Sequence, residues 1–313
     1  MRILILGAGA IGSVLGGFLA KAGHDVTLLG RAWHLDVIRQ RGLTITGLWG
    51  EHRIQHLSTA TSLEELTGEA GFDWVFVCVK AHQTAEVSEG VAALLGPKTL
   101  VCAFQNGLGN YETLTQRISP ARVALGRIIF GAEIEPGLVR VTVCADEVLI
   151  GAPDERFPGE RIVQLASTLQ ESGVPARATT TVLVALWSKV LYNCALNGLS
   201  TLLDVPYGKL LEHATARRMM GAIIEEAYRV AAAHRIPLEP STAQAYLELL
   251  FARLIPDTAA HHPSMLYDLR RGRPTEIEAM NGAIVRLGEA VGVATPMNDL
   301  VTRLVHAKEQ FLG

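Results

Sequence analysis

Three polar residues of one predicted helix have the types and the spacing for proton transfer to a carbonyl compound. Lys189, Asn193 and Asn197 stand at i, i+4 and i+8 in the otherwise apolar segment 186–200, which places them on one helical stripe. Reduction of a ketone leaves negative charge on oxygen, so a lysine could donate the proton while carboxamides hold the polar ends of a small substrate. The alternative is a solvated helix face, because most lysines and asparagines are exposed.

A glycine pattern near the start of the chain predicts a second site. Gly7, Gly9 and Gly12 form G-x-G-x-x-G between a predicted strand over 2–6 and a predicted helix over 13–22. The first glycine permits a tight turn, the second admits a pyrophosphate, and the third allows close helix packing at a phosphate-binding helix end. A turn that binds nothing is the alternative, but strands, helix and glycines agree on a dinucleotide site. The expected contact residues are Gly7, Ala8, Gly9, Ala10, Ile11 and Gly12.

The residue that follows the next predicted strand, 26–29, indicates which dinucleotide binds. A unit for NAD has Asp or Glu near this strand end to bind the ribose hydroxyls, but here Gly30 and Arg31 follow. Asp25 precedes the predicted strand and is poorly placed. Arg31 can pair with a 2′-phosphate through a charge-assisted contact, so we expect NADP(H). The alternative is a solvated surface arginine.

Two further predicted strands, 74–79 and 100–104, end in polar residues. Lys80 and Gln83 follow the first strand, and Asn106 follows the second. Ligands of a doubly wound sheet bind at the carboxyl ends of its strands, so these residues are candidates for contact with the cofactor. The alternatives are a polar pair that opens a helix at Lys80 and Gln83, and an ordinary Asn-Gly turn at Asn106.

Composition limits the class of protein. The 313 residues are 49% hydrophobic and 19% charged, with a formal net charge of −3, which allows two domains with a sizeable core. The absence of a basic tract argues against nucleic acid as a partner. The four cysteines have no C-x-x-C spacing, which indicates buried thiols in a reducing compartment and no metal site.

An apolar run over residues 3–20 could pass for a signal peptide or a short membrane span. It carries the glycines to which a binding role is assigned above, and only one charge, Arg2, precedes it. We expect no other long apolar stretch in the chain. The sequence therefore predicts a cytoplasmic protein without a membrane partner.

The spacing of apolar residues changes near residue 180, where strand patterns end and long helical patterns begin. We therefore predict an α/β protein with a Rossmann-type doubly wound domain over 1–180 and an all-helical domain over 181–313. In the first domain we predict strands over 43–47, 53–57, 123–132 and 174–178, a hairpin of 139–144 with 147–151, and a helix over 160–171. In the second we predict helices over 182–200, 216–234, 241–254, 275–291 and 297–311.

These residues and motifs resemble the 2-dehydropantoate 2-reductase (ketopantoate reductase) family, NADPH-dependent enzymes of pantothenate synthesis. The resemblance covers nearly the whole chain. It includes Arg31 and the blocks GAGAIG (7–12), VKAHQ (79–83), FQNGLG (104–109), LWSKVLYNCALN (186–197) and SMLYDLRRGRPTEIEAMNG (264–282). The last three blocks are much more specific than the first.

The resemblance implies a role for each matching residue. Lys189 would be the general acid, Asn193 and Asn197 would bind the substrate, and Ser264 would contact its carboxylate or hydroxyl end. Cofactor or active-site contacts would come from Lys80, Gln83, Asn106 and Glu276, with Asn106 facing both ligands and a backbone contact near Ala132. From the residues alone, the T-x-x-E spacing of Thr275 and Glu278 predicts a capping box instead, which would explain both glutamates structurally.

One residue departs from the family pattern. Tyr207 stands where better-known members have an asparagine that reaches the substrate. The expected function is NADPH-linked reduction of ketopantoate to pantoate, with the 2-oxo acid under the nicotinamide in a cleft between the domains. The alternatives are a reductase of another small 2-oxo acid and a non-catalytic NADP(H)-binding regulator. The apolar helical domain is compatible with a monomer or with a homodimer.

Overall fold

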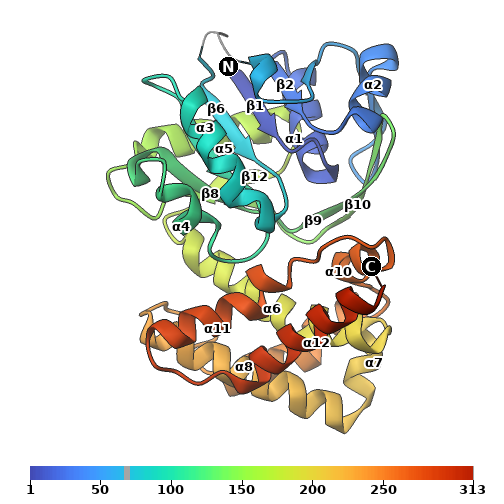
Figure 1. Ribbon diagram of the computed structural model, residues 1–313, viewed down its shortest axis with the longest axis vertical. Coiled ribbons are helices and arrows are strands. Elements are labelled where there is room, and N and C mark those ends of the chain that lie inside the picture. The colour runs from blue at the N-terminus through green and yellow to red at the C-terminus, as the bar shows by residue number, and fades with distance from the viewer. Residues whose placement is uncertain (67–70, 313) are drawn as a thin grey trace. The chain divides into compact units, whose positions relative to one another are not determined.

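The chain divides into two compact units. Unit 1 comprises Met1–Gln105 and Asn110–Val182, and unit 2 comprises Asn106–Gly109 and Leu183–Gly313. The structure is a computed structural model and describes residues 1–66 and 71–312. Figure 1 shows sheets and helices in unit 1 and only helices in unit 2.

An eight-stranded sheet forms the centre of unit 1, in the order β12-β11-β8-β7-β6-β1-β2-β5. The order reverses at β1, as it does in a doubly wound sheet that binds a dinucleotide. Neighbouring strands are parallel except β8 and β11. The predicted fold class is therefore confirmed. The strands are β1 (Arg2–Leu6), β2 (Asp25–Leu29), β5 (Ser58–Ala60), β6 (Trp74–Val77), β7 (Leu100–Ala103), β8 (Val123–Arg127), β11 (Val148–Gly151) and β12 (Ala176–Ala178).

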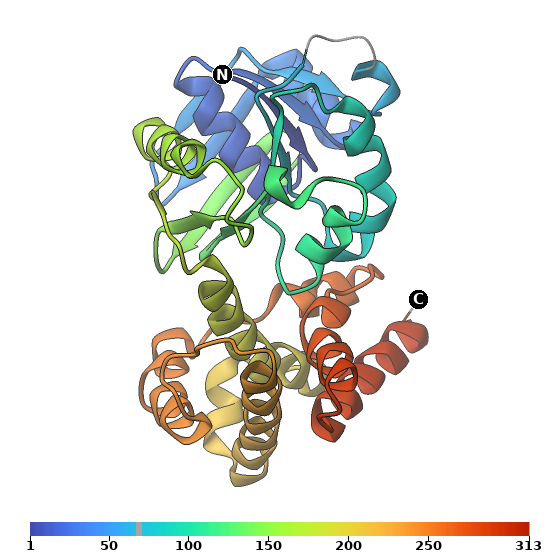
Figure 2. The same cartoon turned by 90° about the vertical axis from the view of Figure 1, so that its left-hand side faces the viewer.

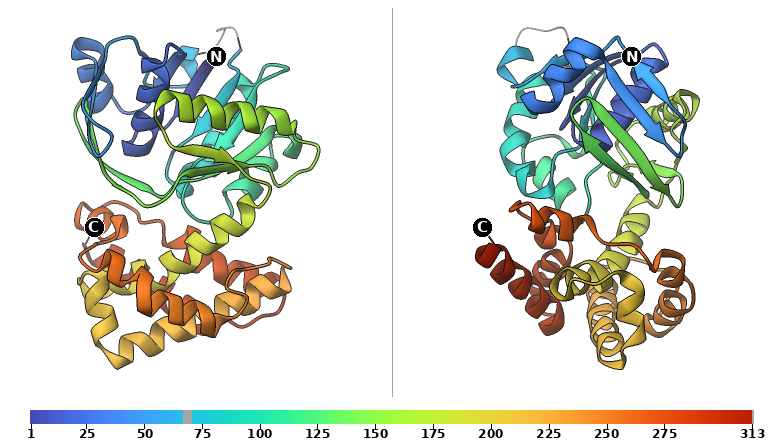
Figure 3. Two further views of the ribbon diagram at one scale, coloured as in Figure 1. Left: turned by 180° about the vertical axis from the view of Figure 1, so that it is seen from behind. Right: turned by 90° about the vertical axis from the view of Figure 1, so that its right-hand side faces the viewer.

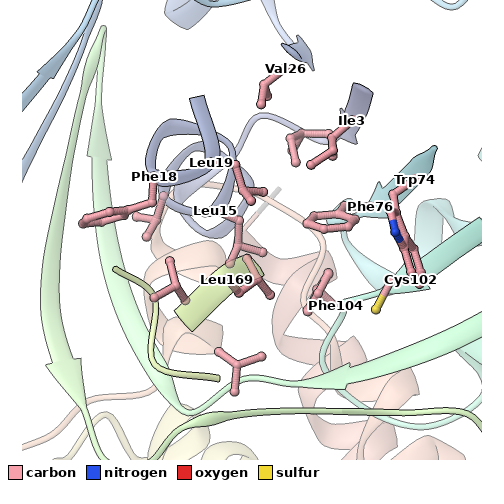
Figure 4. Close-up of a cluster of buried hydrophobic side chains, with 14 of the residues drawn as sticks. Ile3, Leu15, Phe18, Leu19, Val26, Trp74, Phe76, Cys102, Phe104 and Leu169 are labelled. Carbon is pink, nitrogen blue, oxygen red and sulfur yellow. The ribbon is translucent and has the colours of Figure 1, made fainter. Parts of the chain in front are cut away.

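Helices cover both faces of this sheet (Figure 2). The central strands are continuous apolar runs, as strands buried on both faces require. Phe76 of β6 lies edge to face with Phe104, 4.9 Å between ring centroids, and Leu15 and Leu169 belong to the same buried cluster (Figure 4). The helices of unit 1 are α1 (Ala10–Lys21), α2 (Ala32–Arg41), α3 (Thr84–Leu94), α4 (Asn110–Thr115) and α5 (Gly159–Ser172).

The predicted hairpin of 139–144 with 147–151 is wrong. The first arm pairs with β9 and β3 in a separate four-stranded sheet of order β4-β3-β10-β9, whereas β11 joins the large sheet. Alternating apolar residues predict a strand in both segments, but they do not show which sheet each strand joins. The strands of the small sheet, visible in the right-hand view of Figure 3, are β3 (Leu43–Gly47), β4 (His52–Ile54), β9 (Phe130–Glu135) and β10 (Leu138–Cys144).

Two further predictions also failed to separate strands that belong to different sheets. The single strand expected over 123–132 is β8 followed by β9, and the segment expected over 53–57 is β4, with β5 following it in the large sheet. In each case the chain passes from one sheet to the other within a few residues. Residues 123–128 and Phe130 are buried, so the mostly apolar run continues through the passage from β8 to β9 and does not mark it.

Unit 2 is built around α6, whose side chains are buried along most of its length. By length and composition α6 could cross a membrane, contrary to the expectation that no second long apolar stretch exists, but 61% of its most apolar window is buried inside the structure. A helix enclosed by its own fold needs no lipid around it. The helices are α6 (Val182–Leu203), α7 (Tyr207–Glu212), α8 (Ala214–Ala233), α9 (Ala243–Leu249), α10 (Ser264–Arg270), α11 (Asn281–Ala290) and α12 (Pro296–Leu312).

The helix predicted over 275–291 is interrupted. A 3₁₀ turn over Ile277–Ala279 comes first, and α11 begins after Met280. The carbonyl oxygen of Ala279 accepts a hydrogen bond from the amide of Leu108, 2.8 Å away. This carbonyl therefore serves a distant loop rather than a continuous helix, which is a long-range effect that helical periodicity cannot predict.

The last helix, α12, is anchored at both ends within unit 2. The buried carboxylate of Glu226 accepts the amides of Met297 and Asn298 at 2.9 and 3.0 Å, which suits the positive end of a helix dipole. Near the other end, the ammonium of Lys308 donates to the carbonyl oxygen of Thr201 at 2.8 Å, in the last turn of α6. Helix α12 is thus held against α8 and α6.

Candidate active site

The glycine loop connects β1 to α1 in unit 1, where the sequence predicts it. Gly7 has φ +105°, and a Cβ there would lie 2.7 Å from the backbone nitrogen of Val79. A Cβ on Gly12 would lie 2.2 Å from the carbonyl oxygen of Gly7, whereas one on Gly9 would meet nothing within 4 Å. The fold therefore requires the first and third glycines, and the second faces open space that a pyrophosphate could approach.

The first amides of α1 are the groups of this loop that are arranged to attract an anion. Gly7 and Ala8 donate their amides to the carbonyl oxygen of Leu29 at 3.0 and 2.8 Å, so these two serve the fold. The first hydrogen bond inside α1 comes from Ser13, at 2.9 Å, and the amides of residues 10–12 precede it. Such amides at a helix N-terminus, together with the helix dipole, favour an anion.

Arg31 lies two residues beyond the end of β2, with an exposed side chain at the start of α2. A Cβ on Gly30 would lie 2.8 Å from the Cβ of Ala8, so the residue before Arg31 lies against the glycine loop. Asp25 is the first residue of β2 rather than part of the preceding turn, and it pairs with Arg2 at 3.4 Å. Asp25 therefore lies at the end of β2 away from the loop, and Arg31 at the near end.

Lys80 and Gln83 lie in the 3₁₀ turn that follows β6, and both are half-buried. Since β6 is the neighbour of β1, this turn follows the strand beside the glycine loop. The amide of Gln105 holds the turn, because it donates to the carbonyl oxygen of Val79 at 3.0 Å and to the hydroxyl of Thr84 at 2.7 Å. Sequence reasoning missed Gln105, although a polar residue directly after a buried strand is a usable signal.

Ala132, a predicted backbone contact of the cofactor, lies in the other sheet of unit 1. It pairs with Val141 between β9 and β10 and is half-buried. Helix α1 packs against this sheet. Ala132 and the glycine loop therefore belong to different sheets, and α1 packs between them. A contact of Ala132 with the cofactor stays a prediction.

A chain of three side chains forms the polar centre of unit 2. The ammonium of Lys189 donates to Oδ1 of Asn106 at 2.6 Å, and Nδ2 of Asn106 donates to Oε2 of Glu276 at 3.3 Å. Glu276 is buried, with 6% of its surface exposed. The amide of Asn106 thus presents its oxygen to the cation and its NH₂ to the carboxylate, the orientation that matches both charges.

The loop that presents Asn106 depends on a glycine. Gly107 has φ +87°, and a Cβ there would lie 2.3 Å from the carbonyl oxygen of Ala279. The next residue, Leu108, donates its amide to the same carbonyl at 2.8 Å. The Asn-Gly pair is therefore a turn, as one alternative held, and it also brings Asn106 to the lysine and the glutamate.

Asn193 and Asn197 are both buried on α6, with 9% and 4% exposed. The alternative of a solvated helix face is therefore wrong. Within the residues that the structure describes, the carboxamide of Asn193 makes no hydrogen bond, so it retains donors and an acceptor for a ligand. The carboxamide of Asn197 is engaged: its oxygen accepts from the hydroxyl of Tyr207 at 2.6 Å, and its nitrogen lies 3.3 Å from Sδ of Met280.

Tyr207 is the residue that departs from the family pattern, and the structure gives it a defined role. Its ring is 2% exposed and packs edge to face against Tyr192, 5.8 Å between centroids, and against His261 at 5.2 Å. Burial raises the pKa of Tyr207 well above its usual value, so its hydroxyl is protonated and donates to Asn197. Of the two asparagines on the stripe, Asn193 is the one left available to a substrate.

The predicted capping box at Thr275 and Glu278 is wrong. The carboxylate of Glu278 turns to Arg286 and to His306 rather than back to Thr275, whose amide binds Glu309 at 2.8 Å. The carboxylate of Glu276 is buried against Asn106. The partners of these residues lie on other helices and, for Glu276, in the loop that carries Asn106, so the local spacing could not reveal them.

Ser264 is the first residue of α10 and is exposed. Among the described residues, no hydrogen bond joins its side chain to Lys189, Asn106 or Glu276. The structure therefore leaves Ser264 outside the central hydrogen-bonded chain, and its contact with a substrate stays a prediction.

Comparison with known protein families identifies the chain. Residues 3–155 match the model of the family "Ketopantoate reductase PanE/ApbA", and residues 181–309 match "Ketopantoate reductase PanE/ApbA C terminal". The chain belongs to the ketopantoate reductase family. Its members are nicotinamide-dependent oxidoreductases that act on a CH–OH group, with a small keto acid as substrate. The blocks on which the sequence resemblance rests therefore identified the family correctly.

Relatives in this family match the chain over its full length. The 2-dehydropantoate 2-reductase of Aquifex aeolicus is 41% identical over 99% of this chain and 98% of its own. The protein of the same name from Lactococcus lactis is 32% identical over 100% of this chain and 99% of its own.

Two solved structures are similar in fold and sequence. D-mandelate dehydrogenase, solved with NADH and anilino(oxo)acetate, has a TM-score of 0.89 and 32% identity, covering 100% of this chain and 99% of the other. A ketopantoate reductase family protein from Ralstonia eutropha has a TM-score of 0.88 and 31% identity at the same coverage. Proteins of this fold therefore include one, D-mandelate dehydrogenase, that is named for a 2-hydroxy acid other than pantoate.

Proposed function

We propose that the chain reduces 2-dehydropantoate (ketopantoate) to pantoate with NADPH, as a step of pantothenate biosynthesis in the cytoplasm. The observation that carries the proposal is the hydrogen-bonded chain from Lys189 through Asn106 to the buried Glu276, with the unpaired carboxamide of Asn193 one turn along α6. The choice of ketopantoate as the substrate is supported by the relatives, which are named 2-dehydropantoate 2-reductase.

The residues of unit 1 fit a dinucleotide phosphate. Gly9 leaves open space where a side chain would stand. The first amides of α1 form a helix N-terminus of the kind that binds anions. Arg31 offers an exposed guanidinium at the near end of β2 for a 2′-phosphate. When bound, NADPH supplies the hydride that the ketone carbon accepts. Lys80 and Gln83 are further contact residues in this proposal.

Lys189 supplies the proton in the proposed reaction. As the carbonyl carbon gains the hydride, its oxygen gains negative charge and takes a proton from Nζ of Lys189. One N–H of the ammonium is held by Oδ1 of Asn106 at 2.6 Å, which fixes the direction of the group. The carboxylate of Glu276 complements the ammonium through the amide of Asn106.

Asn193 would hold a polar end of the 2-oxo acid with its free carboxamide. Ser264 is the proposed second contact, at the carboxylate or hydroxyl end. We infer that Asn197 supports the site through Tyr207 rather than by touching the substrate, because both ends of its amide are engaged inside unit 2.

The test is a comparison of substrates and cofactors with the purified protein. NADPH oxidation, followed by its absorbance, is measured with ketopantoate and a panel of 2-oxo acids, and is repeated with NADH. We expect the highest kcat/KM for the pair NADPH and ketopantoate. Absence of turnover with every 2-oxo acid would favour a non-catalytic NADP(H)-binding regulator and would contradict the proposal.

A second candidate is the same chemistry on another 2-oxo acid. Tyr207 favours it, because its hydroxyl occupies the oxygen of Asn197 that could otherwise bind a substrate hydroxyl. The similarity to D-mandelate dehydrogenase supports an acid with an apolar side chain, and NADH as cofactor. Phenylglyoxylate, the 2-oxo acid that corresponds to mandelate, therefore belongs in the panel. Higher kcat/KM for it than for ketopantoate would favour this candidate.

A further inference from the structure

The segment that carries Glu276 is held from its outer side by α12. We call residues 275–279 the Glu276 turn. The amide of Thr275 donates to Oε1 of Glu309 at 2.8 Å, and the other oxygen of Glu309 lies 2.7 Å from Nδ1 of His306. Nε2 of the same imidazole lies 2.8 Å from Oε1 of Glu278. One imidazole thus joins the two carboxylates that hold the turn on either side of Glu276.

Only the protonated imidazole can make both of these hydrogen bonds as a donor. A carboxylate oxygen accepts but does not donate, and a neutral imidazole has a single N–H. Burial lowers the pKa of His306, but the hydrogen bonds and charges of Glu278 and Glu309 outweigh it, so the pKa lies above its usual value. The pKa of Glu309 is lowered in turn, because its hydrogen bonds with Thr275 and His306 outweigh the effect of burial.

The charged groups around His306 come from three elements. Glu278 of the Glu276 turn and Glu309 of α12 contact the ring directly, and Arg286 of α11 pairs with Glu278. Two other helices, α8 and α10, also pack on α12. Glu226 of α8 binds the first turn of α12, and Arg270 of α10 pairs with Asp204 at 2.6 Å.

On its inner side, the same turn fixes the loop that presents Asn106. Glu276 accepts from the amide of Asn106, and the carbonyl oxygen of Ala279 accepts from the amide of Leu108. A shift of the turn therefore moves Asn106 through its side chain and through its backbone. Lys189 would follow, because its ammonium binds Asn106 at 2.6 Å. Helix α12 is a firm support for this arrangement, since Lys308 ties it to the carbonyl end of α6.

We propose that protonated His306 is a positioning residue, which holds the Glu276 turn so that Asn106 and Lys189 keep the geometry for proton donation. The proposal rests on the function proposed above for Lys189. It makes the catalytic geometry depend on the charge of a residue on α12 whose ring contacts Glu309 and Glu278 on either side of Glu276.

The sign of the pH dependence follows from the raised pKa. The imidazolium is fully present below about 6.5, the usual pKa of histidine, and is lost as the pH rises through the raised value in the folded protein. Its contribution to positioning and to the free energy of unfolding is therefore present at low pH and disappears in that window.

The test compares His306→Gln with Arg303→Gln. Glutamine removes the charge and one of the two donors, whereas Arg303 is an exposed residue of the same helix that pairs with Asp299. We expect His306→Gln to lower kcat by about two- to tenfold, the effect of one net hydrogen bond, with KM for the dinucleotide unchanged. We also expect the wild-type kcat to fall as His306 loses its proton, and this fall should be absent in His306→Gln. Equal effects of the two variants would overturn the proposal.

A second measurement does not depend on activity. The exchange rate of the Leu108 amide reports whether the turn still holds the Asn106 loop. We expect faster exchange of this amide in His306→Gln, by about two- to tenfold, and no change in Arg303→Gln. Unchanged exchange would overturn the proposal. Absence of all reductase activity in the wild-type protein would refute the proposed function instead, and the Leu108 amide would still decide whether His306 holds the turn.

Discussion

The glycine loop of unit 1 and the Lys189 chain of unit 2 reach chemical function by opposite routes. The relevant groups of the loop are backbone atoms, and its three glycines fall within six residues of sequence. What matters there is the absence of side chains, since a Cβ at Gly7 or Gly12 would collide with main-chain atoms. The Lys189 chain works through side chains whose partners lie 83 and 170 residues apart in sequence.

This difference explains why the two regions tolerate change differently. A methyl group at Gly7 or Gly12 would meet backbone atoms, which cannot easily move aside, so side chains are poorly tolerated at these two positions. In unit 2 the polar groups are side chains, which a substitution can change one at a time, and the hydroxyl of Tyr207 beside Asn197 is one such group. We therefore expect specificity for the substrate to vary in unit 2 while the dinucleotide loop stays constant.

The largest effect should come from Lys189→Ala, which removes the proposed proton donor. We expect kcat to fall by about 10²–10⁴, the usual contribution of general acid catalysis, while the affinity for NADPH, measured by fluorescence titration, stays nearly unchanged. Lys209→Ala is the matched control, because Lys209 is an exposed lysine of the same unit that pairs with Glu212 at 2.9 Å. Normal turnover of Lys189→Ala would exclude it as the acid.

A smaller effect is expected from Arg31→Asp, which tests the side-chain part of the dinucleotide site. Loss of a charge-assisted hydrogen bond should weaken NADPH by about 1.5–3 kcal/mol, roughly 10- to 150-fold, and should leave NADH nearly unaffected. Arg41→Asp makes the same change of charge at the other end of α2. If both dinucleotides weaken equally, Arg31 does not bind the 2′-phosphate.

The glycine loop itself can be dissected with Gly12→Ala and Gly9→Ala. In Gly12→Ala the new methyl group meets the carbonyl oxygen of Gly7, so the free energy of unfolding should fall by about 1–3 kcal/mol. In Gly9→Ala the methyl group meets nothing within 4 Å, and the backbone there is extended, with φ −81°. We expect normal stability and weaker binding of dinucleotide for Gly9→Ala. Denaturant unfolding and titration with NADPH separate the two effects, and equal stability of the variants would contradict this assignment.

The parts of the fold that could be predicted from the sequence are those determined by local interactions. The first strand, the glycine loop and α1 follow from apolar runs and glycines within thirty residues. The hairpin predicted around residues 145–146 failed because β10 and β11 join different sheets. Strand pairing between distant segments depends on which faces meet in the folded chain, and periodicity alone does not contain that information.

The candidate site divides in the same way. The spacing of Lys189, Asn193 and Asn197 predicts one helical stripe, and the structure places all three on α6. The role of Glu276 was obscured by a plausible local pattern, the capping box, because its true partner Asn106 comes from another part of the chain. The sequence also could not predict that the carboxamide of Asn197 is already hydrogen-bonded. Its partner is the hydroxyl of Tyr207, ten residues away and beyond the end of the helix.

The smallest effect is expected from Tyr207→Phe, and it tests whether one hydroxyl tunes the side-chain site. Loss of the hydrogen bond leaves the buried oxygen of Asn197 without its donor, so the free energy of unfolding should fall by about 0.5–1.5 kcal/mol. Tyr246→Phe is the matched control, because the buried hydroxyl of Tyr246 has no hydrogen-bond partner among the described residues, and its removal should be neutral or slightly stabilising. In Tyr207→Phe the freed oxygen of Asn197 can accept from a substrate hydroxyl. The ratio of kcat/KM for ketopantoate to that for a 2-oxo acid without a hydroxyl should therefore rise. An unchanged ratio would mean that Tyr207 stabilises α6 without influencing which acid binds, and specificity would then depend on Asn193 and the remainder of the site.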